Sequence, residues 1–270
     1  MTENTKGDEF MEMIAFSLGD LNAYFYGMII SLSIIIGLMI TYWQLRLRRE
    51  DFFPVIDILI LSILLGLICA RGVYVCRNWN LYQNDWWGIL ELTKGGFSIY
   101  GAFIGFLIVL YFYCKRKNLS ILHWLDILVP AIIFGVAMDQ LGHFIFQSVI
   151  GSPDSGKISG YIEYAFRPSG FEHYEYFRPV ALYQAFWQFI IFALLLIGSY
   201  WQVKKKVFND GIIFMLGISG AALGRFALGF LYLSTKPGLH LEQIFSLIVF
   251  LFCSAYLAIY LISRKAAKLS

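Results

Sequence analysis

Charged side chains are scarce in this sequence, which has 270 residues. Asp, Glu, Lys and Arg make up 14% of the chain, where about 25% is usual for a soluble domain, and apolar residues make up 59%. So little charge on so apolar a chain excludes an ordinary soluble domain and offers nothing for nucleic acid to bind. The composition predicts an integral membrane protein.

Cysteine is also rare, and it forms no metal-binding pattern. The four cysteines, Cys69, Cys76, Cys114 and Cys253, all fall in or at the end of apolar stretches. No CxxC motif or cluster of His and Cys accompanies them. We therefore interpret them as small apolar filler and expect no metal site.

The chain also lacks low-complexity tracts and any stretch with the composition of a soluble domain. We therefore predict one membrane-embedded domain over residues 1–270. The segment 1–19 contains four acidic residues and no basic start leading into an apolar run, so we expect no cleavable signal peptide. It is predicted to be either an amphipathic lead-in along the membrane interface or a polar tail.

Long apolar stretches are what the chain has in abundance. A helix that crosses the hydrocarbon core needs about 20 mainly apolar residues. Such stretches occur at residues 23–43, 54–76, 98–114, 122–150, 180–201, 211–233 and 241–263. The predicted fold is therefore all-α, a polytopic bundle of about seven transmembrane helices, in which the short, glycine-rich third span has the least certain ends.

The basic residues predict how the chain is oriented. Twelve of the 21 Lys and Arg residues form four clusters: Arg46, Arg48 and Arg49; Lys115 to Lys117; Lys204 to Lys206; and Arg264, Lys265 and Lys268. The clusters follow the first, third, fifth and seventh spans, and cytoplasmic loops are enriched in Lys and Arg. We therefore expect the N-terminus outside and the C-terminus in the cytoplasm.

Two connections on the expected outer side are rich in aromatic residues. The loop from Arg77 to Lys94 has three tryptophans, which suit the headgroup level of a bilayer. The longest connection, 151–179, is polar and aromatic, with several Pro and Gly residues. A loop of this length is usually functional or disordered, and its aromatic residues favour a small ordered extracytoplasmic head.

Several ionisable residues fall inside the predicted spans, where charge is costly and often marks a functional site. In the fourth span, Gln140, His143 and Gln147 are spaced to share one helical face, and Asp139 is spaced to pair with His143. This pattern predicts a polar cleft that opens outward. The alternative is hydrogen bonding between helices that only holds the bundle together.

The sixth span contains Arg225 beside Gly220 and Gly224, a spacing that lets another helix approach closely. No acidic residue lies one turn from Arg225 on its own helix, because position 229 is Gly229. A guanidinium in an apolar span needs an anion, and its planar shape suits a phosphate. We expect an external anion such as a phospholipid headgroup, and a structural ion pair is the alternative.

The third span opens with the glycine-rich stretch from Gly95 to Gly105. Gly101 and Gly105 predict close helix packing, and Gly95 and Gly96 permit unusual backbone conformations. Tyr100 lies between these glycines. A tyrosine in such a place is more often an interface anchor than a catalyst, but this crowded setting keeps a catalytic role open.

The ordered set of these motifs resembles that of the phosphatidylglycerol:prolipoprotein diacylglyceryl transferases, seven-span enzymes of bacterial envelopes. The resemblance covers nearly the whole chain. It rests on Tyr26 and Gly27; Gly66, Arg71 and Tyr74; Gly95 to Gly105; Asp126 and Pro130; Gly142, Phe144 and Gly151; Pro179, Leu182 and Tyr183; Gly224, Arg225 and Phe226; and Gln243 and Ser246.

The resemblance implies a reaction and a site. The thiolate of a cysteine in the lipobox of a prolipoprotein signal peptide takes a diacylglyceryl group from phosphatidylglycerol, and glycerol phosphate leaves, with no metal or organic cofactor. The implied location is the bacterial cytoplasmic membrane, with the site facing the outer leaflet. The implied catalytic residues are Arg225, His143 and Tyr100, and the implied substrate-binding residues are Tyr26, Arg71, Gln140, Gly151, Tyr183 and Gln184.

The chain departs from the family pattern at several of these positions. Tyr100 replaces a histidine, Gln140 an arginine and His143 an asparagine, while Gln184 and Gly229 each replace a glutamate. The site thus exchanges charged groups for neutral ones and gains an imidazole, which near neutral pH acts as a base or carries charge. The sequence leaves open a transferase with another lipid donor or acceptor, and a non-catalytic protein that binds lipid or precursor.

Overall fold

The computed structural model describes residues 14–18, 21–83, 86–89, 96–154, 159–233 and 241–269. Its contacts divide the chain into two units, which are described separately. Unit 1 is Met1–Gln44 with Asp126–Ser270, and unit 2 is Leu45–Leu125.

The described residues contain six helices that are long and apolar enough to cross a membrane, which confirms the polytopic all-α prediction. These helices are α2 (Phe25–Arg48), α3 (Phe53–Arg77), α6 (Ile121–Ile145), α7 (Val180–Lys205), α8 (Ile212–Leu228) and α9 (Leu241–Leu269). The span that includes α8 extends to Leu231 through a short 3₁₀ helix, Gly229–Leu231. Each helix lies where an apolar stretch predicted it, although the ends differ by several residues, most of all at the C-terminal ends of α6 and α8.

The expected third span is helix α5 (Ile99–Lys117), and it is not among these six. Its last turn consists of Lys115, Arg116 and Lys117, so the apolar part ends at Cys114. Sixteen helical residues extend about 24 Å, which is shorter than the ~30 Å hydrocarbon core. The helix exists where it was predicted, but its apolar length is marginal for crossing.

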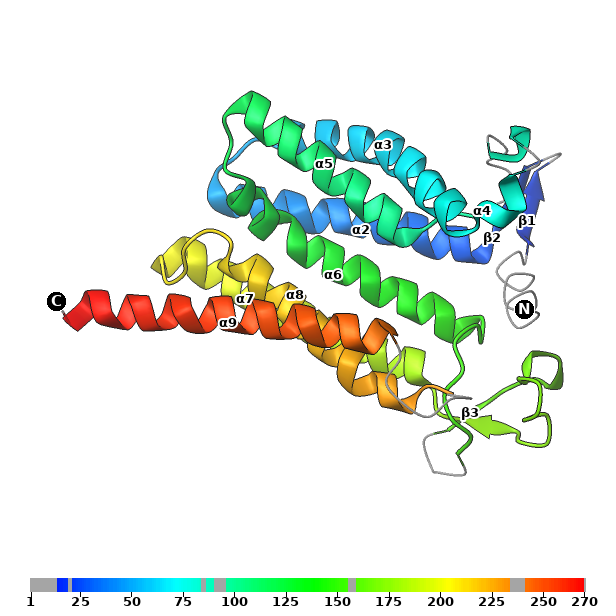
Figure 1. The fold of residues 1–270 in the computed structure, drawn as a ribbon. Coiled ribbons are helices and arrows are strands. Elements are labelled where there is room, and N and C mark those ends of the chain that lie inside the picture. The colour runs from blue at the N-terminus through cyan, green and yellow to red at the C-terminus, as the bar shows by residue number, and fades with distance from the viewer. Residues whose placement is uncertain are drawn as a thin grey trace. The chain divides into compact units, whose positions relative to one another are not determined.

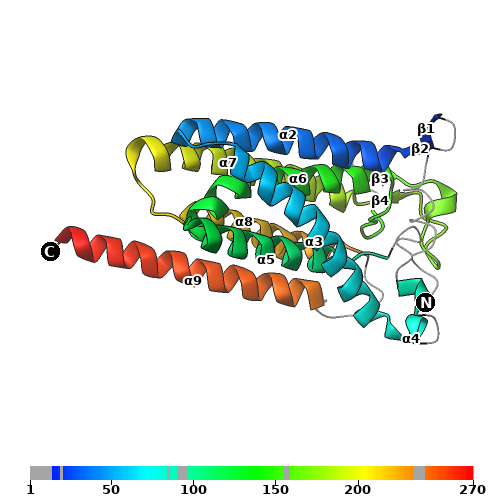
Figure 2. The ribbon, with the colours of Figure 1, turned by 90° about the horizontal axis from the view of Figure 1, so that it is seen from above.

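In unit 2, α3 packs against α5 through small residues, as the sequence predicted for Gly101 and Gly105. A Cβ atom added to Gly105 would lie 2.7 Å from the Cα of Gly66, and one added to Gly101 would lie 2.7 Å from the Cα of Ala70. The two backbones therefore touch, and any larger residue would force the helices apart. Short helix α4 (Trp79–Tyr82) follows the end of α3 (Figure 2).

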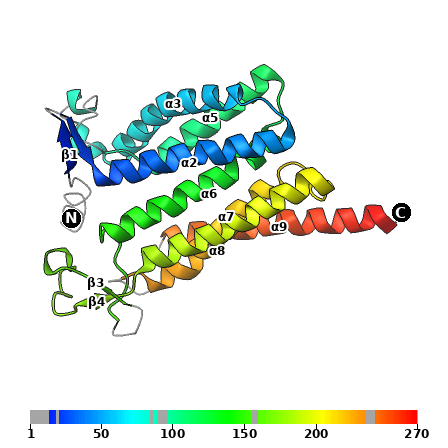
Figure 3. The same ribbon diagram turned by 180° about the vertical axis from the view of Figure 1, so that it is seen from behind.

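In unit 1, α8 packs between α7 and α9, which run beside it (Figures 1 and 3). The small face of α8 receives side chains of α7, because Trp187 packs on Gly224 and donates a hydrogen bond to the carbonyl of Gly220 at 2.9 Å. The buried apolar core beside them includes Val129, Ile133, Leu195 and Ile213.

Asp126 of α6 is fully buried and anchors the start of α8. Its carboxylate accepts hydrogen bonds from the backbone N–H groups of Gly211 and Phe214, at 2.8 and 2.7 Å, and from the amide of Gln202 at 2.6 Å. The N-terminus of a helix has unsatisfied N–H groups and attracts negative charge. This membrane-depth carboxylate therefore has a structural role.

The described residues form two small two-stranded sheets. Strands β1 (Ile14–Leu18) and β2 (Leu21–Tyr24) pair antiparallel before α2, so the described part of the segment 1–19 is a strand. Strands β3 (Gly160–Tyr161) and β4 (Tyr176–Phe177) pair in the predicted head, at the end where α6 ends and α7 begins (Figure 3). A 3₁₀ turn, Tyr164–Phe166, lies between them.

Candidate functional site

A polar cluster lies where α2 begins and α6 ends in unit 1. Tyr26 donates a hydrogen bond to Asp139 at 2.5 Å, and the Nε2 atom of His143 lies 3.6 Å from the other carboxylate oxygen of Asp139. The Nδ1 atom of His143 is 2.7 Å from the hydroxyl of Ser148. The predicted pairing of Asp139 with His143 is confirmed. Tyr26 holds the carboxylate of Asp139, and Ser148 holds the other nitrogen of the His143 ring, so the orientation of the imidazole is fixed from both sides.

Helix α6 is shorter than predicted, which removes Gln147 from the expected helical face. The helix ends at Ile145, and Gln147 has a φ of 50°. The N–H of Ser148 bonds to the carbonyl of His143 and that of Gln147 bonds to the carbonyl of Phe144, a Schellman end in which Gln147 takes the position usually filled by glycine. Predicting a shared face for Gln140, His143 and Gln147 was therefore wrong for Gln147.

Gln147 instead joins the helix end to the head. Its amide donates to the carbonyl of Tyr161 at 3.4 Å, and its side-chain oxygen accepts from the N–H of Glu163 at 3.3 Å. Gln140, one helical turn before His143, has a buried side-chain oxygen with no hydrogen-bond partner among the described residues. A buried acceptor without a partner is uncommon, and it marks Gln140 as available to a ligand or water.

Arg225 is ion-paired within the protein, which is the alternative that the sequence left open beside an external anion. Its Nη2 atom lies 2.7 Å from the carboxylate of Glu242, which belongs to the first turn of α9. The sequence did not indicate this partner, because only acidic residues on the helix of Arg225 itself were considered. The Arg225 side chain remains 48% exposed, so it stays accessible from outside the helix pair.

Tyr232 lies one residue beyond the span that ends at Leu231 and is close to this pair. Burial raises the pKa of the Tyr232 phenol, and the charge of Glu242 raises it further, while the charge of Arg225 and the nearby Gln184 amide lower it. Desolvation is the largest of these effects, so the phenol stays neutral and is available as a hydrogen-bond donor.

Gly151 holds the start of the head against the end of α8. It is buried and forms a β-bridge with Tyr232, and the neighbouring Ser152 donates to the carbonyl of Leu231 at 2.9 Å. A Cβ atom added to Gly151 would lie 2.6 Å from Val180 and 2.9 Å from the Cβ of Arg178. The predicted role of Gly151 in binding is not visible in these contacts, which show a packing role.

The start of α7 carries the predicted pair Tyr183 and Gln184. Gln184 is buried, with 5% of its surface exposed, while Tyr183 is half-buried and its N–H donates to the carbonyl of Pro179. One turn further, the buried Gln188 has a side-chain oxygen with no hydrogen-bond partner among the described residues. Buried amides thus line this side of α7.

Gly229 leaves room that a side chain of α9 occupies. A Cβ atom at position 229 would lie 2.7 Å from the Cγ of Gln243, which is itself buried. A glutamate here, which the resemblance implies for the family, would displace this glutamine. The negative charge beside Arg225 is that of Glu242.

Arg71 and Tyr100 belong to unit 2, and the structure gives them different settings. Arg71 is buried, and its guanidinium donates to three carbonyls, those of Gly88, Ile89 and Gly96, at 2.7 to 3.1 Å. It also lies 5.3 Å from the ring of Tyr82. Tyr100 is 47% exposed in the first turn of α5. Gly95, which was predicted to shape this turn, lies outside the described residues, while Gly96 has the expected positive φ of 77°.

Sequence reasoning missed Ser148, Glu242, Tyr232 and Gln188. Ser148 and Tyr232 lie just past helix ends, where residue spacing along a helix carries no information. Glu242 was detectable as an acidic residue beginning a span, although its pairing with Arg225 depends on how α8 packs on α9. Gln188 follows Gln184 by four residues, and this repeat on an apolar helix indicated that both amides lie on one helical face.

Unit 1 thus combines a basic group, a cation and neutral polar groups. His143 is held by Asp139 and Ser148 in the last turn of α6, where a helix end favours positive charge. Such a histidine can accept a proton. Arg225 can stabilise an oxyanion, and Tyr232 and the buried glutamines can donate or accept hydrogen bonds. These are residue types that transfer of a group away from a phosphate uses.

Comparison with known proteins identifies the family. The family described as prolipoprotein diacylglyceryl transferase matches residues 13–260. The chain is 31% identical to the phosphatidylglycerol--prolipoprotein diacylglyceryl transferase of Prochlorococcus marinus subsp. pastoris, over 97% of this chain and 94% of the relative. The enzyme of the same name from Synechocystis sp. is 32% identical over 78% of this chain and 75% of its own. The chain therefore belongs to the prolipoprotein diacylglyceryl transferase family.

Proposed function

We propose that this protein transfers a diacylglyceryl group from phosphatidylglycerol to the cysteine thiol of a prolipoprotein. The family match carries this proposal. The observation on the structure that supports it most is the half-exposed guanidinium of Arg225, which stands in the family's late arginine motif and is held by Glu242. The enzyme acts in the bacterial cytoplasmic membrane, with its N-terminus outside and its site toward the outer leaflet.

The proposed step forms one bond and breaks one. The cysteine thiolate attacks the glycerol carbon that carries the phosphate, a carbon–sulfur bond forms, the carbon–oxygen bond breaks, and glycerol phosphate leaves with the electron pair. His143 takes the thiol proton, and Asp139 together with the C-terminal end of α6 stabilises the imidazolium. Arg225 stabilises the charge that develops on the departing phosphate.

The remaining residues are assigned to binding. Tyr26 orients Asp139, and Gln140, Tyr183 and Gln184 face the glycerol and ester groups of the donor as neutral hydrogen-bonding partners. Gly151 shapes the connection beside Tyr232. Arg71 organises the turn in which Tyr100 begins α5, and Tyr100 assists at the thiol in place of the family's histidine.

The direct test is transfer by purified protein. Wild-type protein is incubated with labelled phosphatidylglycerol and a peptide containing a lipobox cysteine, and the expected product is a labelled thioether peptide that does not form when serine replaces the peptide cysteine. Arg225→Ala should lower the rate about 10²–10³-fold, as removal of one oxyanion donor does. Arg264→Ala is the matched control, because Arg264 lies near the C-terminal end of α9, far along that helix from Glu242. This variant should retain the wild-type rate.

The Prochlorococcus relative, assayed in parallel, validates the assay. Transfer by the relative but none by this chain, at any pH between 6 and 9, would refute the proposal.

A second candidate is the same transfer from a different lipid donor. It is favoured by the neutral Gln140 and Gln184 at positions where the family has charged residues, because a change in charge at a headgroup site alters which headgroup fits. Competition between phosphatidylglycerol and other labelled phospholipids as donors tests it. Exclusive use of phosphatidylglycerol would eliminate this candidate.

A further inference from the structure

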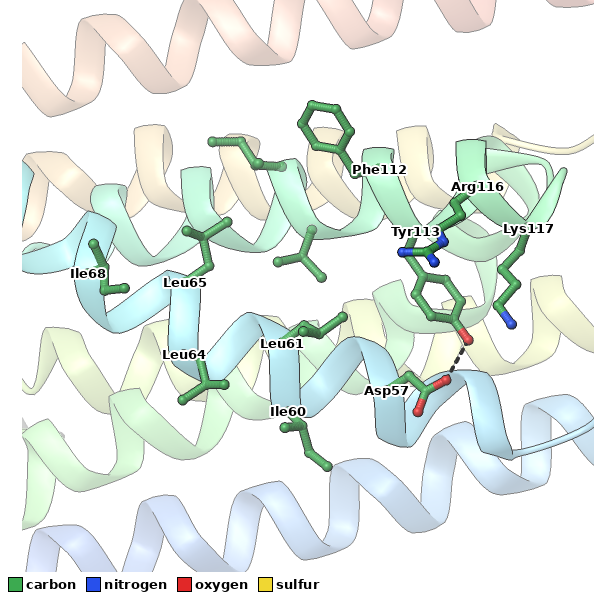
Figure 4. Close-up of a pocket in the computed structure, with 12 residues that line it drawn as sticks. Asp57, Ile60, Leu61, Leu64, Leu65, Ile68, Phe112, Tyr113, Arg116 and Lys117 are labelled. Carbon is green, nitrogen blue, oxygen red and sulfur yellow. Dashed lines mark hydrogen bonds between the residues drawn. The ribbon is translucent and has the colours of Figure 1, made fainter.

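A groove of about 730 Å³ runs between α3 and α5 in unit 2, and none of the residues that line it is assigned to the transfer reaction. Its walls are apolar side chains of both helices, among them Leu61, Leu64 and Ile68 of α3 and Phe112 of α5. Figure 4 shows these side chains following the length of the helix pair. Leu64, Ile68 and Phe112 are each at least 59% exposed, so the groove lies on the surface of the unit.

One end of the groove is polar and cationic. Asp57, Tyr113, Arg116 and Lys117 line it there, and the hydroxyl of Tyr113 donates to Asp57 at 2.8 Å (Figure 4). Two cations face one carboxylate, and the carboxylate already accepts a hydrogen bond. The local charge is therefore net positive, and Lys115, the adjacent residue, adds to it.

The order of apolar and cationic residues along the groove matches the order of parts in a phospholipid. The apolar walls lie within the helices at hydrocarbon depth, and Arg116 and Lys117 lie in the last turn of α5, where the apolar run ends. Lys and Arg that flank membrane helices attract anionic lipid headgroups at the membrane surface. Arg116 also presents a planar guanidinium that suits a phosphate.

We propose that this groove is a binding site for one anionic phospholipid, separate from the donor site. One acyl chain lies between α3 and α5, and the phosphate contacts Arg116 and Lys117. The volume is within the range of about 300–1,000 Å³ that is usual for lipid-sized and drug-sized ligands. A neutral helix of a second subunit would leave the net positive charge at this end of the groove unbalanced, which favours the anionic lipid as the occupant.

The bound lipid has a structural role. It fills the exposed face beside the contact of Gly66 with Gly105, where the two backbones touch but the side chains around them do not close the surface. The lipid therefore adds contacts between α3 and α5, the helix whose apolar length is barely enough to cross the membrane. This site does not depend on the proposed transfer reaction, because no residue of the groove belongs to it.

The test counts lipids that stay bound to the intact protein. Native mass spectrometry of detergent-solubilised full-length protein, titrated with phosphatidylglycerol or phosphatidylcholine, gives the affinity for each. The Arg116→Ala/Lys117→Ala variant should bind phosphatidylglycerol about tenfold more weakly at one site. Lys204→Ala/Lys205→Ala removes the same charge from the end of α7 and should leave that affinity unchanged.

A second variant tests the acyl-chain part with the cations intact. Leu61→Trp fills the groove and should also weaken this one site, without lowering the rate of transfer to the lipobox peptide. Equal phosphatidylglycerol affinity in wild type and the Arg116→Ala/Lys117→Ala variant would overturn the proposal. Equal retention of phosphatidylcholine and phosphatidylglycerol by the wild type would overturn it as well.

Discussion

Arg71 and Arg225 have the same position in the sequence pattern, an arginine inside an apolar helix, but the two units use them differently. Arg71 is 5% exposed, and its guanidinium donates to three backbone carbonyls of unit 2. The side chain of Arg225 is 48% exposed and pairs with the carboxylate of Glu242 in unit 1. An arginine whose donors are used by buried carbonyls stabilises the fold, while one whose side chain is half-exposed is accessible to a substrate.

This difference predicts opposite outcomes for stability and activity. Replacing Arg71 with Ala leaves three carbonyls without their donor, and each one that is buried and unsatisfied costs about 1–3 kcal/mol. We expect a large loss of folded protein in a thermal unfolding assay. Replacing Arg225 with Ala removes an exposed ion pair, worth roughly 0–1 kcal/mol, and should leave the melting temperature nearly unchanged while activity falls.

Arg71→Lys sharpens this comparison. Lysine keeps the charge but lacks the planar set of donors that reaches three carbonyls, so most of the stability should still be lost. A folded and stable Arg71→Ala variant that fails only in transfer would show that Arg71 serves the substrate directly, and the distinction between the two arginines would then be wrong.

The contrast between the arginines was invisible in the sequence, and the reason is spatial. Apolar length and basic ends predicted the helices well, because both act along the chain. The partners of Arg71 are carbonyls 17 to 25 residues away, and Glu242 is 17 residues from Arg225 on another helix. In both cases the partners lie outside the helix of the arginine, so the helical period does not relate them. Pairs within one helix, such as Asp139 with His143, were predicted correctly because the period fixes them.

The next largest effect should come from His143, the other polar group of unit 1 proposed to act on the substrate. His143→Gln removes the base, so transfer should slow by about 10²-fold. His123 of unit 2 is the matched control. Its imidazole also has a carboxylate partner, Glu50 at 2.7 Å, but it is not assigned to the reaction. His123→Gln should therefore leave the transfer rate unchanged.

The pH dependence of the His143→Gln variant separates a base from a structural residue. A free thiol deprotonates with a pKa near 8.5, so without its base the variant should gain rate about tenfold per pH unit up to that value. The wild type should show a flatter profile over the same range. Parallel profiles in the two proteins would show that His143 does not take the thiol proton.

A smaller effect is expected at Gly151, where the head meets the end of α8 in unit 1. The added methyl group of Gly151→Ala would press on Val180 and on Arg178, so we expect a loss of about 1–3 kcal/mol by overpacking. Gly135 of α6 is the matched control, because a Cβ atom there meets nothing within 4 Å. Gly135→Ala should be neutral or should raise the melting temperature.

The smallest predicted effect concerns Tyr232, which links the exposed arginine to the head of unit 1. Burial raises the pKa of its phenol above the ordinary value of 10.0, so the folded state disfavours the phenolate. Below pH 10 the phenol is neutral in both folded and unfolded chains, and its ionisation costs no stability. Above pH 10 the unfolded chain loses this proton first, so folded stability falls as the pH rises toward the folded pKa.

Tyr232→Phe removes this contribution, and between pH 10 and 11 its melting temperature should decline less steeply than that of the wild type. Tyr174→Phe, an exposed tyrosine of the head, should decline as the wild type does. If both variants and the wild type decline together, the pKa of the Tyr232 phenol is not raised by burial.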